Sequence, residues 1–198
     1  MNQTIIQTPR INNIFISGRN NDQALSYAHS IIEACPPGEV ICITDESSSK
    51  NRRLFTQLEK LLKRSNKSDN SSVPVVRVSA TKYIVDGKLS TKALTLETLS
   101  SVRLTPYTQK NIHDVQDITL QMALEDALIS RKTRYVLFAN THKAFNEDSD
   151  HDWSDRTLSA WKFLAQSTGI VLVFDHVEKT NTKNASQLTK GNEYALGN

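Results

Sequence analysis

Gly18 stands at the end of an apolar stretch, Asn13–Ser17, and a helical pattern of apolar residues follows it. The order of strand, glycine and helix is the frame of a phosphate-binding loop, G-x-x-x-x-G-K-[ST]. In that pattern the second glycine admits the phosphates, the lysine contacts them, and the hydroxyl holds Mg²⁺. Counting from Gly18, these three places are occupied by Gln23, Ala24 and Leu25. The loop therefore has the frame of a nucleotide site without its ligating groups. The alternative is an ordinary strand-to-helix turn, with Ala24 and Leu25 packed inward.

The elements that position this loop follow from the hydrophobic pattern. Apolar runs without alternation are typical of strands buried on both faces, and helical patterns separate them, so we expect an α/β fold with a mainly parallel sheet. Strands are expected at Asn13–Ser17, Glu39–Thr44, Val73–Ser79, Arg134–Ala139 and Ile170–Phe174. Helices are expected at Asp22–Cys35, Arg52–Arg64, Asp114–Ser130 and Ser154–Ser167. For the third helix, the apolar stripe is expected at Val115, Ile118, Met122 and Ile129.

The remaining segments are polar. Asp86 and Gly87 predict a hairpin turn within residues 82–88. We expect an N-terminal tail over residues 1–12, one domain over 13–179 and a polar tail over 180–198, the last either loose or forming an edge strand.

Composition limits the class of protein. The chain has 198 residues, a formal charge of +3 and two cysteines. This charge permits binding to nucleic acid without demanding it. No apolar run has the length of a signal peptide core or a membrane span, so we expect a cytoplasmic protein with no membrane partner. Cys35 and Cys42 are expected to be buried free thiols, with a disulfide as the alternative.

Three segments resemble RecA/DnaB-type ATPases in order and spacing. Residues 37–47, PGEVICITDES, resemble the second core strand, with Glu46 at the place of an acidic residue near the reacting phosphate. Residues 134–143, RYVLFANTHK, resemble a Walker B strand, but Ala139 and Asn140 stand where the family has its Mg²⁺-binding aspartate. Residues 158–179 resemble the helix and strand that follow. TniB/TnsC-type AAA+ transposition ATPases share the last two segments and are the second choice.

The resemblance implies a three-layer, RecA-like P-loop NTPase fold with its site at the carboxyl ends of the strands. A missing lysine removes a contact of about 1.5–3 kcal/mol, and the second glycine and the aspartate are missing too. We therefore expect a pseudo-ATPase without a cofactor, whose former site serves as an interface. The residues expected there are Gly18, Arg19, Gln23, Ala24, Leu25, Asp45, Glu46, Ala139, Asn140, Asp175, His176 and Lys179.

The function implied is non-catalytic binding or regulation in DNA replication, recombination or mobile-element processes. The protein would act through self-assembly or a RecA-fold partner. Two alternatives stay open. One is an ATPase in which Arg19 or Lys179 replaces the lost lysine and Glu46 is the base. The other is an inhibitor that caps the filament of another protein.

A basic stretch is the second candidate site. Its members are Lys50, Arg52, Arg53, Lys60, Lys63, Arg64 and Lys67, with Glu59 as the one acid among them. The stretch is either a solvated helix face or a surface for DNA or an acidic protein. We expect no metal site, because the acidic run EDSDHD lacks the glycine and distal glutamate of a calcium loop, and His142, His151 and His176 have no neighbouring ligand at close spacing.

Overall fold

The computed structural model describes residues 11–45, 48–66, 71–79, 84–85, 88–102, 116–141 and 151–177. Five strands form one sheet in the order β1-β2-β7-β6-β3, and every pairing within it is parallel. They are β1 (Ile11–Phe15), β2 (Val40–Asp45), β3 (Val75–Ser79), β6 (Tyr135–Ala139) and β7 (Val171–Val177). The predicted α/β class and all five predicted strands are confirmed. β1 begins at Ile11, two positions inside the segment expected to be a tail.

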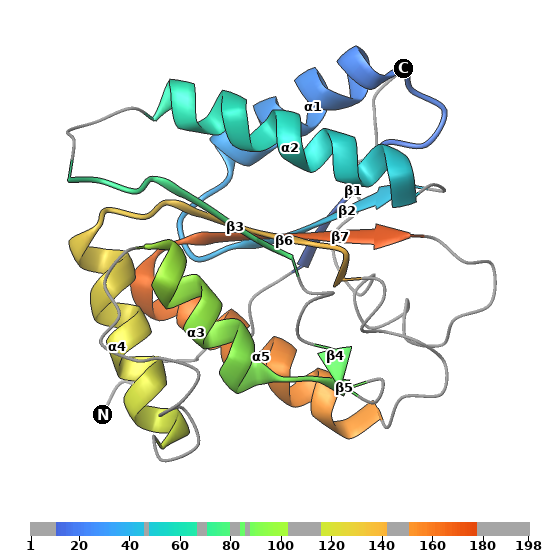
Figure 1. Ribbon diagram of the computed structural model, residues 1–198. Coiled ribbons are helices and arrows are strands. Elements are labelled where there is room, and N and C mark those ends of the chain that lie inside the picture. Colours follow the sequence, from blue (N-terminus) through green and yellow to red (C-terminus); the bar gives the residue numbers. More distant parts are fainter. Residues whose placement is uncertain are drawn as a thin grey trace, which may run out of the picture.

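Helices cover both faces of the sheet, which makes three layers (Figure 1). On one face lie α1 (Asn21–Ala34) and α2 (Ser48–Ser65), which contact each other. On the other face lie α3 (Thr91–Ser101), α4 (Asp117–Ser130) and α5 (His151–Thr168). Among the described residues, no helix is both long enough and apolar enough to cross a bilayer.

The apolar runs of the strands serve two cores, one on each side of the sheet. In β6, Tyr135 and Leu137 pack toward α1 and α2, whereas Val136 and Phe138 pack toward α3, α4 and α5. Successive side chains of a strand point to opposite faces, so a central strand with two covered faces must be apolar at every position.

The predicted hairpin is present as β4 (Ile84–Val85) paired antiparallel with β5 (Lys88–Leu89), and the turn between them lies outside the described residues. It leads into α3, a helix that the sequence analysis did not predict. Ser90 caps this helix by accepting a hydrogen bond from Ala93 N at 3.2 Å. Its buried Thr98 donates to Leu94 O at 2.8 Å, one turn earlier. Threonine hydroxyls that bond to the preceding turn can be buried. The sequence of α3 therefore looks polar, although the helix packs in the core.

The apolar stripe predicted for α4 was wrong. Ile118, Met122 and Ile129 are each 59% exposed, and Val115 lies outside the described residues. The buried stripe instead consists of Leu120, Leu124, Ala127 and Leu128. Both stripes have helical spacing, so periodicity could not decide which of them faces the sheet. The helix is apolar on two opposite sides.

Candidate functional site

The crevice of this sheet lies at the carboxyl ends of β2, β7 and β6. The helices that follow β1 and β2 lie on one face, whereas α5, which follows β6, lies on the other (Figure 1). In open α/β sheets, ligands bind where the connections diverge in this way. β1 is an edge strand outside this crevice.

The Gly18 loop is a tight turn. Gly18 has a φ of 77°, and Arg19 N donates to Ile16 O at 3.2 Å across the turn. A Cβ atom added at Gly18 would meet nothing within 4 Å. The glycine is therefore needed for its backbone conformation, which other residues rarely adopt, and not for close approach of the backbone to another group.

The start of α1 is capped by its own side chains. Asn20 Oδ1 accepts from Gln23 N at 2.9 Å, and Gln23 Oε1 accepts from Asn20 N at 3.3 Å. This reciprocal pair is a capping box, and it occupies N–H groups that a phosphate would otherwise use. Ala24 is buried and Leu25 packs against the same core, so both side chains contribute to the interior.

Asp175 holds the ends of β6 and β7 together. Its carboxylate is fully buried and accepts from Asn140 N and Thr141 N, both at 2.6 Å. Thr141 Oγ1 adds a third bond to it at 2.9 Å and also bonds Asp175 O. Asn140 has a φ of 62°, and its side chain donates to Ser79 Oγ at 3.0 Å. The carboxylate thus fixes a left-handed residue at the end of β6.

The polar atoms of this cluster are used in hydrogen bonds within the protein. The Asp175 oxygens accept hydrogen bonds from backbone and hydroxyl donors, and the neighbouring Ala139 is buried and carries only a methyl group. In the part of the chain that the structure describes, no group of three or more His, Cys, Asp or Glu residues could hold a metal ion. Residues 147–150 of the acidic run 147–152 and His142 lie outside that part, and so do the side chains of His151 and Asp152.

A small pocket lies beside the Gly18 loop, between the first turns of α1 and the N-terminal half of α2. Arg19 stands at this pocket, half-buried, with its guanidinium 4.2 Å from the centroid of the Tyr27 ring. Asp45, at the end of β2, is buried. The pocket is lined by Ile16, Arg19, Asn21, Ala24, Asp45, Leu54 and Gln57. Its lining therefore includes one basic side chain, Arg19, and one carboxylate, Asp45, among amide and apolar side chains.

The residues predicted at the strand ends lie in two groups, which meet where Asp45 lines the small pocket together with Arg19 and Ala24. Gly18 to Leu25 follow β1, whereas Ala139 and Asn140 end β6, three strands away, a separation of about 14 Å. Asp45, Asp175 and Asn140 lie at the ends of neighbouring strands around the crevice. His176 is placed in β7 by its backbone, and Glu46 and Lys179 lie outside the described residues.

Sequence reasoning missed the position of Lys50 relative to the sheet. α2 begins at Ser48, directly after the crevice strand β2, so Lys50 stands in its first turn. Counted from Thr44, residues 44–51 read TDESSSKN and match the eight-residue phosphate pattern only at Lys50, because both glycines are missing and Asn51 replaces the hydroxyl residue. Spacing therefore gave no signal for Lys50, and only the strand order shows that the crevice adjoins β2 and not β1.

The basic face of α2 is exposed. Its solvent-facing cations are Arg52, Arg53, Lys60, Lys63 and Arg64. Lys63 bonds Glu59 at 2.7 Å, and Arg77 lies 3.6 Å from the same carboxylate. From Arg53 to Arg64 the face runs about 16 Å along the helix. The side chain of Lys50 and all of Lys67 lie outside what the structure describes.

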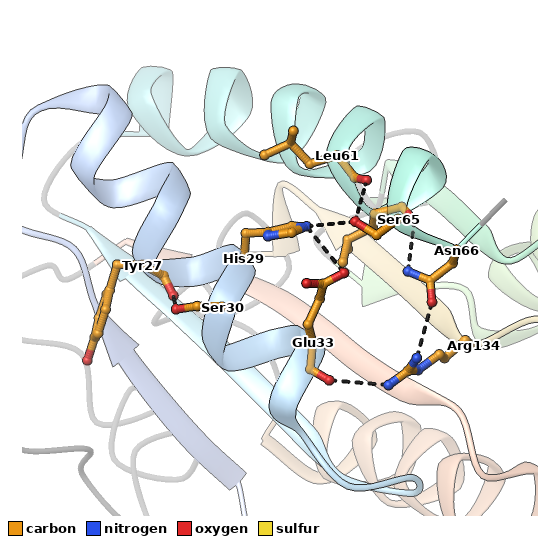
Figure 2. A network of polar contacts seen from close by, with 9 residues as sticks. Tyr27, His29, Ser30, Glu33, Leu61, Ser65, Asn66 and Arg134 are labelled. Carbon is orange, nitrogen blue, oxygen red and sulfur yellow. Dashed lines mark hydrogen bonds and ion pairs between the residues drawn. The ribbon is translucent and has the colours of Figure 1, made fainter.

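A polar network joins α1, α2 and β6 at the opposite end of the sheet (Figure 2). His29 Nε2 lies 3.3 Å from Ser65 Oγ and 3.6 Å from Glu33 Oε1. A catalytic triad needs the serine and the carboxylate on different ring nitrogens, and here both meet the same one. Arg134 donates to Glu33 O at 3.2 Å and to Asn66 Oδ1 at 3.1 Å. The network ties the helix ends to the sheet.

Both cysteines are free and buried. Burial raises the pKa of Cys35 to about 11 and that of Cys42 to about 12. The thiolate is the nucleophilic form of cysteine, so neither thiol is activated at neutral pH.

Comparison of the chain with protein-family models and with curated protein sequences found no match.

Proposed function

We propose that this chain is a non-catalytic binding protein built on a RecA-like P-loop scaffold that has lost its nucleotide site. The observation that supports the proposal most is the Asp175 cluster. A nucleotide site needs carboxylates free to support Mg²⁺ at the strand ends. Asp45 and Asp175 are the two buried carboxylates described at these strand ends. Asp175 accepts bonds from Asn140 and Thr141, and β6 ends in Ala139, which has no carboxylate.

The start of α1 lies outside the crevice and is poorly suited to replace that site. Its capping box uses the N–H groups of Asn20 and Gln23, and Asp22 places a negative charge in the first turn. In place of catalysis, the protein would bind a second copy or a RecA-fold partner in DNA replication, recombination or mobile-element processes in the cytoplasm. Arg19, beside the small pocket, would contribute a charged group to such an interface.

A second candidate is phosphate binding at the turn between β2 and α2. The observation that favours it is the strand order, which places this turn beside the crevice with Lys50 in the first helical turn. A helix N-terminus and a lysine are both suited to a phosphate group. Under this candidate, the protein would be an ATPase or a nucleotide-binding protein with an unconventional phosphate-binding site.

Thermal unfolding with Mg-ATP distinguishes the two candidates. If the dissociation constant exceeds millimolar, 1 mM Mg-ATP adds less than about 0.4 kcal/mol and shifts Tm by no more than about 2 °C. The second candidate instead requires a shift of several degrees that Lys50→Ala abolishes. Lys63→Ala, on the exposed face of the same helix, is the matched control and should retain any shift. A shift lost only in Lys50→Ala would refute the proposal that the nucleotide site has been lost.

The proposed DNA association predicts a role for the basic face of α2. Arg53→Glu combined with Lys60→Glu should weaken DNA binding for all sequences, since phosphate contacts carry no sequence information. Removing two such contacts should flatten the slope of log K against log salt by about 2. Fluorescence anisotropy at several salt concentrations measures both effects. Unchanged binding by the folded double variant would exclude this face.

A further inference from the structure

Helices α4 and α5 expose large apolar side chains on the side of the molecule away from the sheet. Ile118, Met122 and Ile129 of α4 are each 59% exposed, and Phe163 of α5 is 60% exposed. Within the described part of the chain these are the exposed large hydrophobic residues. We call these four residues the docking face.

Spacing and one hydrogen bond place the four residues together. The three members in α4, Ile118, Met122 and Ile129, are four and seven residues apart. Glu125 lies between the last two on the same side of the helix. Ser167 Oγ of α5 donates to Glu125 Oε1 at 3.0 Å, which joins the two helices at this point. Phe163 lies one turn before Ser167 and therefore flanks the α4 stripe. The docking face is thus a continuous surface across both helices.

The charged residues within α4 are all acidic. The fourteen residues of this helix include Asp117, Glu125 and Asp126 and no lysine or arginine, and Arg131 and Lys132 follow it directly. Lys92 lies 3.6 Å from Asp117, at one end, whereas Asp126 is exposed beside the stripe. If a second copy presented the same face across a two-fold axis, these carboxylates would approach one another, which is unfavourable. A partner with basic groups around apolar anchors complements the face.

We propose that the docking face binds an amphipathic helix of a partner protein, with apolar residues on one side and Lys or Arg along its flanks. From Ile118 to Ile129 the stripe extends about 16 Å, the length of three helical turns. Recognition of a helix by its apolar anchors at one-turn intervals is a common mode of binding. This surface lies on the opposite side of the sheet from α2 and does not involve the nucleotide edge, so it is independent of the proposed function.

Binding to a synthetic helix tests the inference. The probe is a fluorescent leucine/lysine peptide of about five turns, with leucines on one face, and its counterpart has glutamate in place of every lysine. In the Arg53→Glu, Lys60→Glu variant, which removes basic groups of α2 that could hold the glutamate peptide, the lysine peptide should bind at least about tenfold more tightly than the glutamate peptide. Ile118→Ser combined with Met122→Ser should weaken its binding by at least about tenfold. Fluorescence anisotropy reports both values.

Two charge variants distinguish binding at the docking face from general attraction of the lysine peptide to acidic residues on the surface. Asp126→Lys should weaken binding of the lysine peptide severalfold, whereas Asp22→Lys, at another exposed site on α1 across the sheet, should not. Circular dichroism confirms that each variant is folded. Absence of binding, or equal binding by the wild type and the double serine variant, overturns the proposal. So does a wild-type dimer in light scattering that the double variant abolishes, because the occupant is then a second copy.

Discussion

Asp175→Ala should lower the free energy of unfolding by about 3–5 kcal/mol, a large part of the stability of a domain of this size. The fully buried carboxylate accepts two backbone N–H bonds of 2.6 Å from Asn140 and Thr141. Alanine offers no acceptor, and each buried N–H that loses its partner costs about 1–3 kcal/mol. The left-handed conformation at Asn140 loses its support at the same time.

Urea unfolding followed by circular dichroism measures this loss. Asp175→Asn keeps one acceptor oxygen but turns an NH₂ group toward the other N–H, so a smaller loss is expected. Asp126→Ala, at an exposed position, should change stability by less than about 0.5 kcal/mol. If Asp175→Ala were as stable as the wild type, Asp175 would not hold the two strand ends together.

Phe138→Ala should cost about 3–5 kcal/mol. Phe138 is fully buried in β6, between the aromatic rings of α5 and β7. Its ring meets Trp161 edge-on with centroids 4.6 Å apart and stacks on Phe174 at 5.3 Å. Truncation leaves a cavity lined by rings that cannot collapse into it, and it also removes two favourable aromatic pairs.

Phe163→Ala is the matched control for this prediction, because the same atoms are removed from a side chain that is 60% exposed. Its cost should be below about 1 kcal/mol. Thermal unfolding of the two variants under identical conditions gives the comparison. Similar losses for both would contradict the placement of Phe163 at the surface. If Phe163→Ala weakened partner binding and left Tm unchanged, the result would support the docking face.

The elements were predictable because their signals are local. The apolar runs at β2, β6 and β7 are continuous since both sides of these strands are covered. α1 was predicted to within a residue at each end, because a polar cap precedes it and Pro36 follows it closely. α3 was missed, since its buried threonines look polar in the sequence and are satisfied only once the helix has formed.

The strand order could not be predicted from such signals. A pattern along the chain shows that a strand exists, but its neighbours depend on crossover helices that pack tens of residues away. The loop at Gly18 therefore looked like the start of a nucleotide site, although β1 is an edge strand and β2 adjoins the crevice. The two apolar stripes of α4 were equally ambiguous, because both have the period of a helix and only packing against α3 and α5 selects one.

The α/β class, the parallel sheet and the residue types at each strand end follow from periodicity and turn chemistry, which are local properties of the chain. What those residues do depends on contacts that form only in the folded protein. Asp175 meets its donors across sequence separations of 34 and 35 residues, so nothing local to it indicates that its carboxylate closes the end of β6. Likewise, the exposure of Ile118, Met122 and Phe163 depends on which sides of α4 and α5 the sheet buries, and this is set by long-range packing.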